Sequence, residues 1–279
     1  MKIDRRNLLG MGAGLAASMA IIGSPSSVLA ATKPAAKFTD TDILNFALNL
    51  EYLEAAYYSL AAGIEMPFEA TIFGGSPVPF QTPAIRAYAN EIAADENAHV
   101  TFLRAAIGRD AVAAPPINLR ESFTAAAVAA GLIQQGQTFN PFLNETSFLL
   151  GAFIFEDVGV TGYKGASPLI QDKGILEAAA GLLAVEAYHA SLVRTTLFAL
   201  GQAEATQKIS DARDTLDGPG DLDQGLDPVT GNIVPTDQNG LAFSRTFSQV
   251  LRIVYLTPNL GVRRGGFFPF GIDGRINKT

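Results

Sequence analysis

The chain has two histidines, and each stands three residues after a glutamate in a long apolar segment. The pairs are Glu96–His99 and Glu186–His189. A spacing of three puts the carboxylate and the imidazole on the same face of a helix, where both can bind one metal ion. Cysteine is absent, which excludes thiolate ligands, so a metal must be held by nitrogen and oxygen atoms. The two pairs therefore predict a helical protein with a metal site made of Glu and His.

The hydrophobic pattern predicts four long helical segments, at about residues 40–62, 83–107, 141–162 and 173–200. Thr39 to Asp42 provide N-cap chemistry for the first segment, and a glycine soon after three of the segments marks their ends. A Gly- and Pro-rich loop joins the first two. Residues 109–140 form a long connection with a short helix at about 125–132. Two helical pairs joined by one long crossover are a known connectivity of four-helix bundles, so the predicted fold class is all-α.

Single glutamates stand in the apolar first and third segments, at Glu51 and Glu156. A carboxylate buried among Leu and Phe is costly unless it is paired or bound to a metal. Each of the four segments thus supplies a carboxylate, and two also supply a histidine. Glu54 is an alternative to Glu51, because the two lie one turn apart on the same helical face. Glu91 and Glu177 are interpreted as surface residues.

This ligand set is that of di-metal carboxylate bundles, and a family resemblance supports it. The chain resembles the desiccation-related branch of the ferritin-like superfamily over most of its length after residue 30, in the segments 46–58, 95–106, 148–164, 181–196, 209–224 and 239–256. The resemblance implies a ferritin-like four-helix bundle at residues 31–204. Its six metal ligands would be Glu51, Glu96, His99, Glu156, Glu186 and His189. Tyr58 follows Glu51 by seven residues, as in ferritin-like first helices, which favours Glu51 over Glu54.

Residues next to the ligands are candidates for a supporting shell. Asp95 resembles the acidic residue that, in many di-iron proteins, accepts the free imidazole N–H of the opposite histidine. Val185 stands at the corresponding place before Glu186, so the two halves of the site differ. Asp95 could instead be a plain surface charge. Tyr58, like Tyr88 and Tyr188, could hydrogen-bond near the site or simply pack.

Residues 1–30 are predicted to be an export signal. Lys2 and two arginines precede an apolar run, and Val28 to Ala30 have the small-residue pattern of a cleavage site. The arginine pair resembles twin-arginine signals, so we expect a periplasmic or extracellular protein that is not inserted in the membrane once the signal is removed. An uncleaved anchor is the alternative. Removing residues 1–30 takes away three basic residues and one acidic residue, which changes the net charge from −7 to −9.

Residues 205–279 are predicted to be a loop-rich C-terminal extension with one short helix, within 243–256. Four aspartates among glycines could bind calcium, since oxygen ligands at alternate positions suit that ion. The alternative is an acidic, turn-rich loop. These aspartates are Asp217, Asp221, Asp223 and Asp227.

Two functions fit the predicted site. The first is an oxidoreductase with two iron or manganese ions that reacts with peroxide, superoxide or oxygen during oxidative or desiccation stress. The second is a stress-protective or structural protein in which the metals only cross-link the helices. A binding role for the Phe- and Gly-rich segment 265–271 is a third, weaker hypothesis. The acidic charge argues against nucleic acid as a partner, and the long extension argues against a storage cage but leaves small homo-oligomers open.

Overall fold

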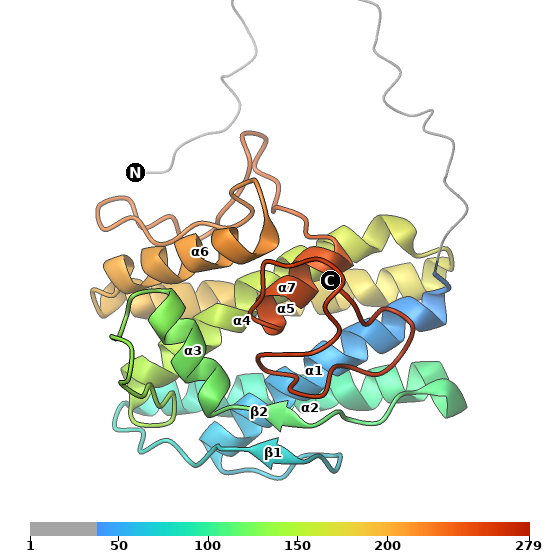
Figure 1. Cartoon of the computed structure of the whole chain (residues 1–279), viewed down its shortest axis with the longest axis horizontal. Helices are drawn as coiled ribbons and strands as arrows, with labels where there is room; N and C mark the ends of the chain where they lie inside the picture. The colour runs from blue at the N-terminus through green and yellow to red at the C-terminus, as the bar shows by residue number, and fades with distance from the viewer. Residues whose placement is uncertain (1–37) are drawn as a thin grey trace, which may run out of the picture. The chain divides into compact units, whose positions relative to one another are not determined.

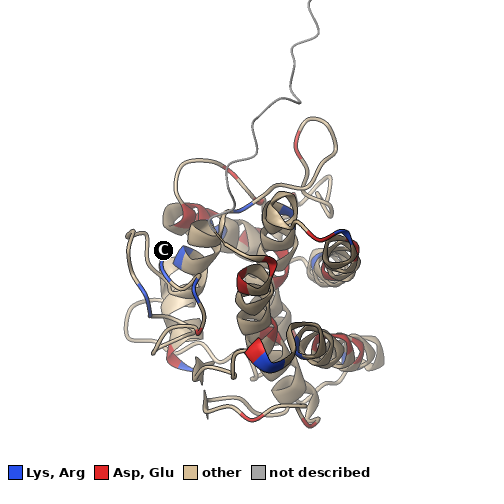
Figure 2. Ribbon diagram, turned by 90° about the vertical axis from the view of Figure 1, so that its right-hand side faces the viewer, with Lys and Arg blue, Asp and Glu red and all other residues tan. Residues whose placement is uncertain are grey.

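Four long helices, arranged in two pairs, form the body of the structure, a computed structural model that describes residues 38–279. The helices are α1 (Asp40–Ala62), α2 (Pro83–Ile107), α4 (Glu145–Ala166) and α5 (Lys173–Ala199). α1 packs along α2 and α4 along α5, and the pairs meet where α1 contacts α4 and α2 contacts α5 (Figure 1). Viewed from the side, the helices are seen nearly end-on (Figure 2). The predicted all-α bundle is confirmed, whereas the export signal at 1–30 lies outside the described residues.

The helix ends follow local cap chemistry. Thr39 forms a capping box with Asp42 at the start of α1, and Gly63 ends that helix with φ = 72°. α4 begins four residues later than predicted, because the Asn144 side chain accepts a hydrogen bond from the Ser147 N–H and so sets the N-cap there. These caps place the ligand-bearing turns in the middle of their helices.

The long crossover between α2 and α4 runs over one side of the bundle. It contains a 3₁₀ turn (Gly108–Asp110), strand β2 (Ile117–Asn118) and helix α3 (Glu121–Ala129), which begins four residues before its predicted position. β2 pairs in parallel with β1 (Ile72–Phe73) from the loop between α1 and α2. A second 3₁₀ turn, Ser167–Leu169, links α4 to α5. The crossover thus lets α4 return alongside α1.

The C-terminal extension packs on α4 and contains two helices, α6 (Ala203–Asp217) and α7 (Phe247–Val254). The single short helix predicted there corresponds to α7, and α6 was missed. The buried face of α6 includes the polar residues Thr206, Ser210 and Arg213. It therefore lacks the regular spacing of apolar residues by which a helix is identified from sequence. Figure 1 shows both helices against the bundle.

A buried network of ion pairs holds the extension in place. Arg213 Nη2 lies 2.7 Å from Asp223 Oδ1, and Arg245 Nε lies 2.7 Å from Asp217 Oδ2. Arg213 and Arg194 also reach Asp157 on α4. Burying these charges is tolerable because each has partners of opposite sign.

This network corrects the calcium hypothesis. Asp217 and Asp223 are paired with arginine guanidinium groups, which supply the positive charge that an ion would bring. Asp227 accepts hydrogen bonds from the backbone N–H groups of Val229 and Thr230 and so forms a turn. Among residues 38–279, the acidic groups that converge as a potential metal site lie in the bundle and not in the extension.

Of the helices in the described part of the chain, α5 is long and apolar enough to cross a membrane by length and composition alone. It nevertheless carries three buried ionisable side chains, Glu186, His189 and Arg194. Such groups face a polar interior and not lipid. We therefore interpret α5 as a bundle helix.

Asn49 links α1 to the C-terminal end of the chain. Its fully buried side chain donates to the carbonyl of Asp273 at 3.0 Å and accepts from the N–H of the same residue at 3.2 Å. We expect Asn49→Ala to lower the free energy of unfolding by about 1–3 kcal/mol, because two backbone groups lose their partner. Urea denaturation would measure this loss. The exposed Asn90→Ala should change stability by less than about 0.5 kcal/mol, and equal effects of the two substitutions would contradict the prediction.

Candidate metal centre

All six predicted ligands lie in the interior of the bundle, and none is more than 7% exposed. α1 and α4 contribute one glutamate each, and α2 and α5 contribute the Glu-x-x-His pairs. The helical spacing of three turns each glutamate and its histidine toward the same interior. The structure therefore brings together Glu51, Glu96, His99, Glu156, Glu186 and His189.

One half of the cluster is built around His99. Its Nδ1 atom lies 3.2 Å from Glu51 Oε2, 3.5 Å from Glu96 Oε2 and 3.8 Å from Glu186 Oε1. One ligand atom from each of these four residues lies within 4.8 Å of the others. Three carboxylates and one imidazole at this separation can share one metal ion, and the donor set suits iron, manganese or zinc.

The other half is built around His189. Its Nδ1 atom lies 3.0 Å from Glu96 Oε1 and 3.9 Å from Glu156 Oε2. Its Nε2 atom lies 3.1 Å from Asp95 Oδ2. Asp95 lies on α2, opposite this histidine of α5, and its contact with Nε2 leaves Nδ1 facing the cluster. Glu96 directs one oxygen to each histidine, so it is the residue that the two halves share.

Unpaired polar atoms converge in the cluster. Glu96 and Glu186 each have both carboxylate oxygens buried without a hydrogen-bond partner, and one Glu156 oxygen and His189 Nδ1 are in the same state. The contact between His189 and Glu96 is short in distance but lacks hydrogen-bond alignment. Buried polar groups are normally satisfied. Orphaned atoms that face one another are what a metal centre requires, so the residues fit a pair of metal ions.

Comparison with known proteins agrees with this geometry. Residues 39–199 match the sequence profile of the family described as Ferritin-like domain. The chain belongs to the ferritin-like family. It is 33% identical over 236 residues to the desiccation-related protein PCC13-62 of Craterostigma plantagineum, which covers 75% of each chain. It is 28% identical over 266 residues to the ferritin-like catalase Nec2 of Nesocodon mauritianus, which covers 85% of this chain and 84% of the relative. No solved structure matches it.

Burial and neighbouring charges shift the pKa values of the carboxylates and histidines in this cluster. Burial and the nearby Glu96 raise the pKa of Glu51 to about 7, and burial raises the pKa of Glu156 to about 8. Burial alone would also raise the pKa of Glu96, but contacts with His189 and His99 outweigh it and lower that pKa to about 2. Burial opposes the charge on His99 and His189, yet the carboxylates raise their pKa values to about 11 and about 9. Without metal, protons therefore carry the positive charge of the centre.

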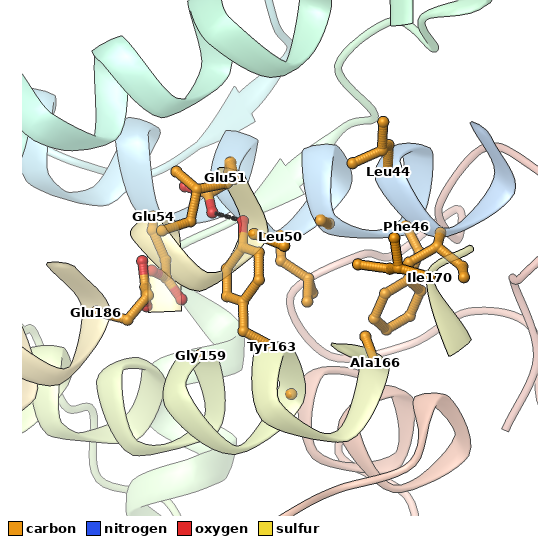
Figure 3. A pocket seen from close by; sticks show the side chains of 15 residues that line it. Leu44, Phe46, Leu50, Glu51, Glu54, Gly159, Tyr163, Ala166, Ile170 and Glu186 are labelled. Carbon is orange, nitrogen blue, oxygen red and sulfur yellow. Dashed lines mark hydrogen bonds between the residues drawn. The ribbon is translucent and has the colours of Figure 1, made fainter. Parts of the chain in front are cut away.

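A further carboxylate, Glu54, lies beside the cluster. The sequence treated it as an alternative to Glu51, but the structure buries both, and only Glu51 contacts His99. Burial, followed by repulsion from Glu96 and Glu156, raises the pKa of Glu54 well above its ordinary value. Gly159 makes room for the neighbouring Glu186, since a Cβ atom there would overlap Glu186 Oε2, whereas Glu54 Oε1 would lie at an ordinary contact distance of 3.7 Å. Figure 3 shows Glu54 and Glu186 side by side.

Two tyrosines each donate a hydrogen bond to a candidate ligand glutamate on the other helix of the α1–α4 pair. Tyr58 on α1 donates a hydrogen bond to Glu156 on α4, and Tyr163 on α4 donates one to Glu51 on α1. Each tyrosine stands seven residues after the glutamate of its own helix. This spacing pointed to Tyr58 from the sequence, whereas Tyr163 was missed. By contrast, Tyr88 is half-buried with no such contact to the ligands, and Tyr188 is 76% exposed.

We expect Tyr163→Phe to weaken metal binding by about 10- to 100-fold, the usual cost of losing a partner of a metal ligand. The lost hydroxyl leaves a buried oxygen of Glu51 without its donor. Titration with a competing chelator would measure the affinity. Tyr188→Phe, the matched control on α5, should leave it unchanged because that side chain is exposed. Identical affinities for Tyr163→Phe and the unaltered protein would show that Tyr163 only packs.

Proposed function

We propose that the protein holds two iron or manganese ions in this cluster and uses them as an oxidoreductase on hydrogen peroxide. The observation that carries the proposal is the convergence of buried, unpaired carboxylate oxygens from Glu96, Glu156 and Glu186. The four ligand glutamates together carry four negative charges, which balance the positive charge of two divalent metal ions. Glu51, Glu186 and His99 would hold one ion, Glu156 and His189 the other, and Glu96 would be shared by both.

A bound metal pair supplies the two-electron change by which two hydrogen peroxide molecules become two water molecules and one dioxygen. The residues of the chain would keep this reaction separate from bulk water, since the six ligands are almost fully buried. Tyr58 and Tyr163 orient Glu156 and Glu51 through their hydroxyl groups. Glu54 can hold a proton on its carboxyl group, as its raised pKa requires.

The relatives support this proposal in different ways. One is named a ferritin-like catalase and another a desiccation-related protein, so peroxide removal during drying stress is a function consistent with both. Export by the predicted signal at residues 1–30 would place the activity in the periplasm or outside the cell. Dioxygen and superoxide are the other oxidants that such a centre could use.

The test combines metal analysis with oxygen measurement. Protein loaded with iron or manganese is analysed for two metal ions per chain, then given hydrogen peroxide in an oxygen electrode. We expect one dioxygen for every two peroxide molecules consumed. Glu91→Gln, at an exposed position of α2, serves as the control and should behave like the unaltered protein. Protein that holds two metals but is inert to peroxide, dioxygen and superoxide would overturn the enzyme proposal and favour metals that only cross-link the helices.

A further inference from the structure

An apolar cavity leads into the metal centre from one side. It lies between α1, α4 and α5, and carboxylates gather at one of its ends (Figure 3). Glu51, Glu54 and Glu186 line this inner end together with Tyr163. The rest of the lining carries only hydrocarbon side chains and two glycines, and it includes Leu44, Phe46, Ala47, Leu50, Ala179 and Leu182.

The side toward solvent is marked by partly exposed residues. Ala47 and Leu50 in the apolar part are half-buried, as is Tyr163 beside the carboxylates, and the other members of the lining are buried. Tyr163 also donates its hydroxyl to Glu51, so its ring stands between the apolar part and a ligand. The cavity thus lies between the outside and the carboxylate cluster.

The space is small. The cavity leaves about 30 Å³ for the centre of a molecule the size of water, and about 10–15 Å³ of such space suffices for one water. A few atoms therefore fit, whereas an organic substrate does not. The cavity therefore suits a molecule of a few atoms.

The apolar lining favours some small molecules over others according to their polarity. A polar molecule in the apolar part would lose its hydrogen bonds to water, which costs several kcal/mol, and an anion would lose more. Superoxide would also meet the negative field of the glutamates at the inner end. Dioxygen is uncharged and makes no strong hydrogen bonds, so it enters without these costs.

We propose that this cavity binds dioxygen and conducts it between the metal centre and solvent. Its role in turnover rests on the proposed function, in which dioxygen is the product of peroxide disproportionation. Binding of an apolar gas does not rest on that function, because it depends only on the shape and the lining of the cavity. The two claims can therefore be tested separately.

Xenon, an apolar atom that occupies dry cavities, is the probe for gas binding. The full chain is titrated with dissolved xenon, and occupancy is followed by ¹²⁹Xe NMR and by crystals kept under xenon pressure. Ala179→Leu places a larger side chain in the cavity. Ala190→Leu makes the same change on α5 but points into a different space, next to Arg194 and Ile233. Ala47→Leu is a second filling variant at a half-buried position, where a larger side chain is easier to accommodate.

We expect xenon beside Leu50 and Leu182 in the unaltered protein and in Ala190→Leu, with at least tenfold weaker binding in both filling variants. Absence of xenon from this cavity, or equal binding in the filled variants, would overturn the proposal. In the loaded enzyme, the filling variants should release dioxygen from peroxide more slowly than Ala190→Leu, and equal rates would remove the conducting role. If no loaded form evolves dioxygen, the proposed function fails while the xenon result still decides gas binding.

Discussion

Glu96→Gln is expected to remove both metal ions from the protein, whereas Glu156→Gln should remove one. Glu96 has one oxygen 3.5 Å from His99 Nδ1 and the other 3.0 Å from His189 Nδ1, so it serves both halves of the cluster. Glu156 contacts only the His189 half. The amide that replaces Glu96 is neutral and has one oxygen, so it cannot bridge two ions as a carboxylate does.

Quantitative metal analysis of protein purified in parallel would measure this difference. We expect about two ions per chain in the unaltered protein and in Glu91→Gln, about one in Glu156→Gln and nearly none in Glu96→Gln. Circular dichroism would confirm that the variants remain helical. Two retained ions in Glu96→Gln would show that this residue does not bridge, and equal losses in the two ligand variants would show that the halves do not bind separately.

Much of the centre could be predicted from sequence because the ligands are rare residues at helical spacing. The chain has two histidines, and a Glu three residues earlier places both groups on one helical face without any knowledge of the fold. Glu156 could be predicted because the segment around it is apolar, so a carboxylate there needs a partner. The bounds of α2 follow from Pro83 at its start and Gly108 after its end, which are strong local signals.

What could not be predicted depends on contacts across the bundle. Spacing alone cannot tell that Tyr163 reaches Glu51 on another helix, although the same interval in both helices was a visible clue. Glu51 and Glu54 lie on one face, and only the contact of Glu51 with His99 separates their positions. α6 was missed for a related reason, since Arg213 is buried there by partners that come from distant segments.

The extension and the centre meet at two consecutive residues of α4. Glu156 points into the cluster, while Asp157 pairs with Arg194 of α5 and with Arg213 of α6 in the extension. The buried ion pairs therefore fix the segment of α4 that supplies a ligand. Through Arg213 the extension thus contacts α4 at the residue next to a member of the cluster.

The metal-free protein is expected to lose stability as the pH rises from about 5.5 to 8.5, whereas the metal-loaded protein is not. Glu51 and Glu156 have ordinary pKa values of 4.5 that the fold raises to about 7 and about 8. The folded state thus keeps protons that the unfolded chain has released. The free energy of unfolding therefore falls as the pH rises to these values. His99 and His189 act in the same direction, because their raised pKa values give stability that is complete below about 6.5 and falls as the pH rises from there toward the folded values of about 11 and about 9.

Glu96 acts oppositely, but its lowered pKa matters only below about 4.5 and so outside this window. Each pKa unit corresponds to about 1.4 kcal/mol, and each kcal/mol to about 2–4 °C for a chain of this size, so the combined loss should lower the melting temperature by at least about 10 °C. Thermal unfolding of chelated and loaded samples at several pH values would measure it.

Metal ions replace the protons of these groups, so their binding strengthens as the pH rises and offsets the loss. The gap between the two melting curves should therefore widen from pH 5.5 to 8.5. The variant with both Glu51→Gln and Glu156→Gln should flatten the pH dependence of the metal-free protein, because it removes two of the groups that exchange protons. Parallel pH dependence of the chelated and loaded forms would show that the cluster does not exchange protons for metal, and it would count against the di-metal site itself.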